Sequence, residues 1–434
     1  MSRRPGPVSR LLALPTELHL KILEETFFVP APWPANLTLR RLALVCRRLH
    51  TIATPVLYRE VDLRRASAVR SVHAVRCFLA TIVAKPELGR FVRWLSLASA
   101  ITTSPRKGVA LLLRAQTLAD WGEAFPQLRT LFFASYVTDG MAFLWDAHFP
   151  HLRRFCFHRE LYSTAPAPVD DSTSSQLLMQ FLARHAGSLR DVDLSALPLP
   201  RDSLADWKAV DAHVPTAIPV FTVLRRLEAP AFFFDLAGRL SLPALDELHI
   251  DWLPTARAQQ PAGDGTLGDE DWHQAVLRKV ADSLRGPTHL KIINKYSGTS
   301  PGLGEASETG RILSAVASSL PQTRFLGLCT AGNATIIDDA SQALGRLHLP
   351  ALQTLVFTFD SDDDTDTEDP RAQRVAACFR ESKGLRALAA LSDVVDCWVR
   401  AGTQAEVGRV SDDEFVAFVK ENCGLDSVFI SNFM

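Results

Sequence analysis

The chain has 434 residues, of which 47% are hydrophobic and 22% charged, with a formal net charge of −1 and seven cysteines. This composition argues against disorder of the whole chain, and the charge provides no global field that would recruit nucleic acid or an anionic membrane. The cysteines are scattered and form no C-x-x-C pair, which predicts reduced thiols in a cytoplasmic or nuclear protein. The length favours two or three domains, or a single solenoid.

The N-terminal segment "MSRRPGPVSRLLALP" contains an apolar run too short for a signal peptide, and we expect residues 1–10 to be disordered. No stretch approaches the roughly 18 apolar residues that a membrane span needs, so no membrane partner is expected. Positive charge is concentrated locally, because residues 1–70 hold twelve Lys and Arg against five Asp and Glu.

A helix is predicted over residues 11–27, "LLALPTELHLKILEETF". Pro15 suits the first turn of a helix, where its missing N–H costs nothing. Leu14, Leu18 and Ile22 recur at every fourth position, and a second apolar stripe runs beside them through Leu20. The apolar face is wider than one packing contact needs, which favours a second surface that binds a partner.

A second helix is predicted after the Pro-rich break "PAPWP", with Asn36 as its N-cap and Pro55 at its end. Apolar residues recur along it at spacings of three and four, among four arginines. The following "YREVDL" alternates Val61 and Leu63 and predicts a half-buried strand.

The ordered set of "LPTELHLKIL" and "LRRLALVCRRLHTIATPVLYREVDL" resembles an F-box of the form common in fungal proteins. The resemblance covers residues 11–63 and implies a small all-helical domain that binds the Skp adaptor of a cullin–RING ubiquitin ligase. The adaptor-binding residues that it implies are Leu14, Pro15, Leu18, Ile22, Leu42, Val45 and Leu49. Each of them could instead pack the core of the helices, and the arginines could form a solvated face.

The remainder of the chain, residues 64–434, repeats a strand-like L-x-x-L-x-φ motif at intervals of about 20 to 45 residues. The copies are VRWLSL, LRTLFF, LRRFCF, LRDVDL, LRRLEA, LDELHI, LQTLVF, LRALAA and LDSVFI, with degraded copies around Leu290 and Leu326. Helical segments precede most copies, and stacked units of this kind can bury apolar faces that one unit cannot.

These repeats resemble divergent leucine-rich repeats. The predicted fold class is therefore α/β: all-α F-box helices followed by an irregular, horseshoe-like solenoid. Helices are predicted over 68–84, over 174–187 with Gly187 as the stop, and over 411–424 with a capping box of Ser411 and Glu414. Loops are predicted at 160–176, 254–270 and 297–306, and the acidic run at 360–370 is predicted to be a disordered loop.

Side chains between the buried residues of each strand should point outward and form the target-binding face. That pattern nominates Phe132, Arg154, His158, Asp193, Glu228 and His249, together with Cys156 and Lys291. No known catalytic or phosphate-binding motif is present, and the acidic run lacks the glycine and glutamate of a calcium loop. We therefore expect no enzyme activity, no metal and no cofactor.

The function that these observations favour is a substrate-recognition subunit of an SCF-type ubiquitin ligase: the F-box would bind the Skp adaptor, and the repeats a target protein. The alternative is a leucine-rich-repeat-like scaffold, not linked to ubiquitin, whose N-terminal helices only cap the solenoid. No nucleic-acid partner is expected, and the target protein is left open.

Overall fold

A computed structural model describes residues 14–27, 32–63, 68–97, 120–134, 146–158, 172–195, 220–230, 233, 241–251, 277–278, 280–281, 289–294, 308–330, 336–359, 368–391, 395–400 and 407–423. The chain divides into two compact units, Met1–Ser188 and Leu189–Met434. The predictions for residues 1–10, the loops at 254–270 and 297–306, and the last motif, LDSVFI, lie outside the described residues. Within those ranges, no helix is long and apolar enough to cross a membrane.

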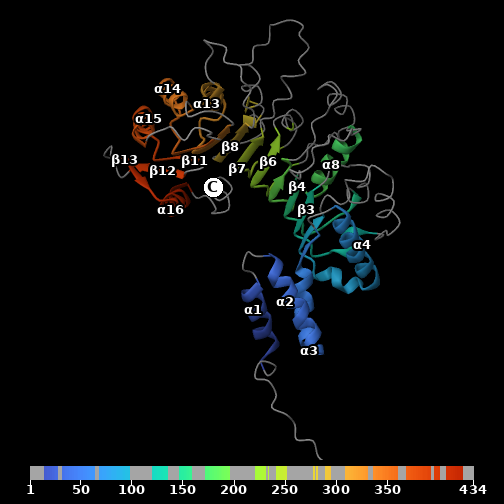
Figure 1. The fold of residues 1–434 in the computed structure, drawn as a ribbon. Helices are drawn as coiled ribbons and strands as arrows, with labels where there is room; N and C mark the ends of the chain where they lie inside the picture. The colour runs from blue at the N-terminus through green and yellow to red at the C-terminus, as the bar shows by residue number, and fades with distance from the viewer. Residues whose placement is uncertain are drawn as a thin grey trace, which may run out of the picture. The chain divides into compact units, whose positions relative to one another are not determined.

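The first unit begins with three helices, α1 (Thr16–Phe27), α2 (Pro32–Val45) and α3 (Arg47–Arg59), which pack side by side (Figure 1). Leu39 of α2 and Ile52 and Ala53 of α3 form the buried centre of this bundle. Partly buried apolar residues pack around that centre: Leu20, Leu42, Ala43, Val56 and Leu57.

The predicted boundaries of the second helix are wrong. Asn36 lies inside α2, which begins at Pro32, because prolines in a first turn remove N–H groups that have no helical acceptor. Cys46, with φ −158° and ψ 163°, is extended and separates α2 from α3. Pro55 lies within α3 rather than at its end, and the turn that follows it is held by the packing of Val56 and Leu57.

Four parallel strands of the first unit pair in chain order: β1 (Glu60–Asp62), β2 (Trp94–Leu97), β3 (Thr130–Ala134) and β4 (Arg154–His158). The connections include α4 (Ala68–Ala84), η1 (Pro86–Phe91) and α6 (Trp121–Ala124), and α8 (Ser172–Arg184) follows β4. The strand after α3, the strands of the first three motifs and the helix at 68–84 are therefore confirmed.

The two ends of α8 each correct a prediction. Residues 172–176 are helical rather than part of a loop, and the helix ends at Arg184, before the predicted stop at Gly187. His185 helps to end it, because its Nδ1–H donates to the Phe181 carbonyl at 2.8 Å while its Nε2 accepts from the Phe149 N–H at 2.9 Å. Burial lowers the pKa of His185 to about 4, which keeps the ring in the neutral form that this pair of hydrogen bonds requires.

The second unit contains seven parallel strands in chain order: β5 (Asp191–Asp193), β6 (Arg226–Pro230), β7 (Glu247–Asp251), β8 (His289–Asn294), β9 (Phe325–Thr330), β10 (Thr354–Phe359) and β11 (Ala387–Leu391). All seven coincide with copies of the motif. Two antiparallel strands that have no motif and were not predicted, β12 (Val395–Arg400) and β13 (Val407–Val410), follow them.

Three helices, α13 (Glu308–Ser319), α14 (Ile336–Arg346) and α15 (Glu368–Glu381), lie together on one face of these strands (Figure 1). The last residues of the predicted acidic loop, Glu368–Pro370, are the first turn of α15. Acidic residues and proline both suit that position, so composition alone misplaced the helix start. Residues 360–367 lie outside the described ranges.

The last helix, α16 (Asp412–Cys423), lies on the opposite face, beside β12 (Figure 1). Its buried residues Phe415 and Val419 pack with residues of β9 to β12: Phe325, Val356, Ala387, Ala389 and Cys397. The capping box is confirmed, because the Ser411 N–H donates to Glu414 Oε2 at 2.9 Å and the Glu414 N–H donates to Ser411 Oγ at 3.4 Å.

The fold is thus a mixed α/β structure with helices at its N-terminus. Among the described strands, β1 pairs only with β2 and β13 only with β12, so the sheet is not closed.

Candidate functional site

Apolar side chains remain exposed on the N-terminal helices. Leu18 and Ile22, one turn apart on α1, are 46% and 44% exposed, and Leu44 and Val45 at the end of α2 are 85% and 66% exposed. We call these four residues the apolar patch. Exposed apolar side chains that gather on neighbouring helices mark a candidate interaction surface, whereas single ones are common on any protein.

A hydrogen bond ties the segment before α1 to the start of α3. Arg48, at the start of α3, donates from Nη2 to the Leu14 carbonyl at 2.7 Å. Leu14 immediately precedes α1, and Arg48 lies three residues after Val45. The bond therefore holds the start of α1 near the junction of α2 and α3, where Leu44 and Val45 are exposed.

The remaining residues nominated for adaptor binding lie beside or beneath the apolar patch. Pro15 is exposed and Leu14 half-buried at the start of α1. Leu42 is half-buried against the bundle centre, and Leu49 is 6% exposed, so these two side chains mainly hold the helices together. Leu44 was not nominated; its position beside Val45, just before the helix break at Cys46, is the signal that could have found it.

A second candidate site is the polar face of four strands, β5 to β8. We call these four strands the polar strands. Side chains at alternate positions form two rows across these strands, and the strand register places Asp193, Glu228, His249 and Lys291 in one row. The other row contains Asp191, Arg226, Glu247 and His289. Neighbouring side chains in a row are close enough to interact directly.

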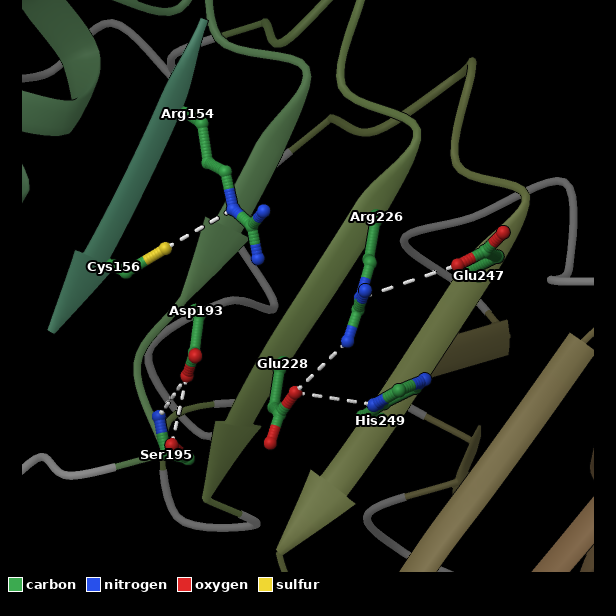
Figure 2. Close-up of polar contacts among 8 residues, drawn as sticks. All are labelled: Arg154, Cys156, Asp193, Ser195, Arg226, Glu228, Glu247 and His249. Carbon is green, nitrogen blue, oxygen red and sulfur yellow. Dashed lines mark hydrogen bonds and ion pairs between the residues drawn. The ribbon is translucent and has the colours of Figure 1, made fainter. Parts of the chain in front are cut away.

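Glu228 is the centre of the polar contacts (Figure 2). Its Oε2 accepts from His249 Nδ1 at 3.1 Å and lies 3.4 Å from Nη2 of Arg226. Arg226 also approaches Glu247, with 4.0 Å between Nε and Oε2. The side chains of Arg226, Glu228 and Glu247 are 13%, 16% and 19% exposed, so the group is half-buried rather than freely solvated.

Burial alone would raise the pKa of Glu228, but the hydrogen bond from His249, the charge that His249 carries when protonated, and the charges of Arg226 and Lys291 lower it to about 2. Burial lowers the pKa of His249 to about 4, although Glu228 partly opposes that shift. At neutral pH Glu228 is therefore ionised and His249 neutral, with its Nδ1–H donated to the carboxylate. The fixed carboxylate can accept a hydrogen bond from a partner group but offers no proton.

The first polar strand ends in a local turn. Asp193 Oδ1 accepts from the N–H and the hydroxyl of Ser195, at 3.0 and 2.8 Å (Figure 2). This contact fixes the Asp193 carboxylate at the carboxyl end of β5.

The nominated target-binding residues differ in exposure. Phe132, Asp193 and Glu228 are half-buried and Arg154 is exposed, whereas the side chain of His158 lies outside the description. Three residues expected to point into solvent are instead buried: Cys156 at 2%, His249 at 1% and Lys291 at 6%. In the first unit, Arg154 Nε–H donates to Cys156 Sγ at 3.3 Å, so the arginine lies close against the thiol (Figure 2).

The sequence analysis missed Arg226 and Glu247, which shape the environment of Glu228. Each lies two residues before a nominated residue on the same strand, so the alternation that selected Glu228 and His249 also selects them. In the described ranges, no group of three or more His, Cys, Asp or Glu residues is placed to hold a metal ion.

Comparison with known proteins finds one family match: the F-box-like family matches residues 11–64, which contain the three helices, the apolar patch and β1. The N-terminal region is therefore an F-box-like domain, in agreement with the resemblance seen in the sequence. No curated protein matches the chain.

Proposed function

We propose that the protein is a substrate-recognition subunit of an SCF-type cullin–RING ubiquitin ligase. The observation that carries the proposal is the coincidence of the F-box-like match at 11–64 with four exposed apolar side chains on the same helices. An adaptor that covers these side chains would remove apolar surface from water, which is favourable by about 25 cal/mol per Å².

Adaptor binding divides between two sets of residues. Leu18, Ile22, Leu44 and Val45 would contact the adaptor directly, with Leu14 and Pro15 at the edge of the contact. Leu42 and Leu49 would act from within, because their burial fixes the angle at which α2 and α3 present the apolar patch.

The strand and helix units after residue 64 would form a leucine-rich-repeat-like solenoid that binds the target protein. We assign the target contact to the polar strands and to Phe132 and Arg154 of the first unit. The carboxylates of Asp193 and Glu228 are held by Ser195, Arg226 and His249, so they are preorganised to accept donors from a target.

The protein would supply no catalytic side chain. It would hold the target near the ubiquitin-loaded enzyme, and the rate would come from proximity. The cytoplasm or the nucleus is the compartment that this role requires.

The test is a pull-down of the full chain with purified Skp adaptor. Leu18→Asp combined with Ile22→Asp should abolish binding, because two charges would be buried in an apolar interface. Val83→Asp, which changes a 53% exposed valine on α4, is the matched control and should bind as wild type does. Circular dichroism checks that all variants fold.

Absence of binding by the folded wild-type chain would overturn the ligase proposal. Equal loss in the Val83→Asp control would show that the effect is not specific to the apolar patch.

A further inference from the structure

The residue immediately before a strand is an arginine in most of the described repeats. In the first unit these residues are Arg59, Arg93, Arg129 and Arg153, which precede β1, β2, β3 and β4. Arg93, Arg129 and Arg153 are exposed, and Arg59 is half-buried. We call these four residues the arginine edge.

Backbone hydrogen bonds place the arginine edge in one line. The N–H of Arg93 donates to the Arg59 carbonyl at 2.9 Å, that of Arg129 to the Arg93 carbonyl at 2.8 Å, and that of Arg153 to the Arg129 carbonyl at 2.7 Å. Successive arginines are therefore one strand apart, about 4.8 Å along the edge of the sheet. This spacing between the backbones of successive arginines is set by the sheet and does not depend on side-chain rotamers.

The arginine edge therefore carries four like charges in a line that the backbone fixes. Arginine is the side chain whose planar group of five N–H donors matches a carboxylate. A regular row of positive charges is complementary to a chain of carboxylates, which would bind it by attraction between opposite charges.

The second unit shows that the position does not require arginine. There the equivalent residues are Arg190 and Arg225, then Asp246, and farther along Arg324, Gln353 and Arg386. The backbone of Asp246 makes the same contact, its N–H donating to the Arg225 carbonyl at 2.9 Å. Aspartate thus fills the same backbone position, so the unbroken row in the first unit is not a demand of the repeat.

We propose that the arginine edge of the first unit binds an extended acidic segment of a partner protein. A protein segment fits better than nucleic acid for two reasons. The whole chain has a net charge of −1, so no wide positive field attracts a polyanion. The row is one residue wide, and exposed carboxylates such as Glu60 adjoin it in sequence, which suits a narrow chain rather than a broad phosphate backbone.

The inference goes beyond the ligase proposal, because it concerns the edge of the sheet and does not require the adaptor. The test is fluorescence anisotropy of the full chain with a fluorescein-labelled peptide of alternating glutamate and serine, at low and at physiological salt. Arg129→Glu combined with Arg153→Glu should weaken binding by about tenfold, and Arg129→Gln with Arg153→Gln by less. Binding should also weaken as salt is added.

The matched control is Arg40→Glu with Arg41→Glu, which makes the same change of charge at two exposed arginines of α2 and should leave peptide binding unchanged. Circular dichroism verifies the fold of each variant. No peptide binding by wild type at low salt, or equal weakening in the control, would overturn the proposal. Tighter binding of a single-stranded oligonucleotide of equal charge, lost in the Arg129→Glu/Arg153→Glu variant, would assign the edge to nucleic acid and would also overturn it.

Discussion

Two helices of twelve residues, α1 and α16, each carry a pair of apolar residues four positions apart, but the exposure of the two pairs is opposite. Leu18 and Ile22 of α1 are 46% and 44% exposed, whereas Phe415 and Val419 of α16 are 2% and 0% exposed. The period of an amphipathic helix shows which side chains form its apolar face. Whether that face is buried depends on the surface that packs against it, which we call its cover.

The cover of α16 is visible in the strands. On the face that α16 contacts, β9 to β12 carry Phe325, Val356, Ala389 and Cys397, whereas the two rows on the same face of β5 to β8 are polar. The pair on α1 stays exposed within the F-box-like domain, and we assign its cover to the adaptor. The comparison yields four predictions.

The largest expected effect is on α16. Phe415→Ala should lower the free energy of unfolding by about 4 kcal/mol, because it removes a buried aromatic ring and leaves a cavity against the strands. Urea unfolding followed by circular dichroism measures it. Lys420→Ala, at an exposed position of the same helix, should change the value by less than about 0.5 kcal/mol. Similar shifts in both variants would show that α16 does not cover the sheet.

The polar strands should make the free energy of unfolding depend on pH in acid, whereas the strands that α16 covers should not. Because burial lowers the pKa of His249 from 6.5 to about 4, the unfolded chain binds its proton first as the pH falls. Stability should therefore decrease between about pH 6.5 and pH 4, by up to about 3 kcal/mol from this group. Urea midpoints at a series of pH values measure the slope.

His249→Asn, which keeps an N–H for Glu228 but does not titrate, should reduce that slope, and the part due to His185, whose pKa burial also lowers to about 4, should remain. In the wild-type chain a further loss of stability should follow below pH 4.5, because the pKa of Glu228 is lowered from 4.5 to about 2. Phe415→Ala should leave the slope unchanged, since the residues packed around α16 are Phe, Val, Ala and Cys. An unchanged slope in His249→Asn would contradict the assignment.

On α1 the effect should appear in binding rather than in folding. Leu18→Ala with Ile22→Ala should weaken adaptor affinity by about thirtyfold, or about 2 kcal/mol, because two half-exposed side chains lose their apolar contact. The free energy of unfolding should change by less than about 0.5 kcal/mol. Isothermal titration calorimetry and urea unfolding measure the two quantities, with Val83→Ala as the control. A large loss of stability without loss of affinity would place the pair in the core instead.

The smallest effect concerns the start of α16. Ser411→Ala removes the hydroxyl of the capping box and should lower the free energy of unfolding by about 1 kcal/mol. Thr16→Ala at the start of α1, where no such box is present among the described contacts, should change it less. Urea unfolding of the pair measures the difference, and equal effects would contradict a capping role specific to Ser411.

The strands could be predicted because the L-x-x-L-x-φ motif encodes a strand and its register together, and its copies coincide with β2 to β11. The boundary at Pro55 could not, because the packing of Val56 and Leu57 outweighs the local cost of a proline inside the helix. The strands β12 and β13 were missed because their sequences contain no copy of the motif. They pair antiparallel, unlike the strands that the motif predicts.

The candidate sites show a similar division. Alternation predicted that Glu228 and His249 lie on one face, and the strand register places them side by side, but alternation could not give depth, and His249 is buried. Depth depends on side chains from neighbouring strands, such as the pairing of Arg226 with both Glu228 and Glu247. The F-box-like domain was predictable because its helices carry an ordered set of residues, whereas which of them stay exposed depended on the packing of α2 against α3.

Hydrogen exchange of the full chain with and without the Skp adaptor tests the central claim most directly. The account predicts protection on binding in Thr16–Phe27 and around Leu44 and Val45, with no change in the polar strands. Protection confined to the strands after residue 64, or no protection at a saturating adaptor concentration, would contradict it.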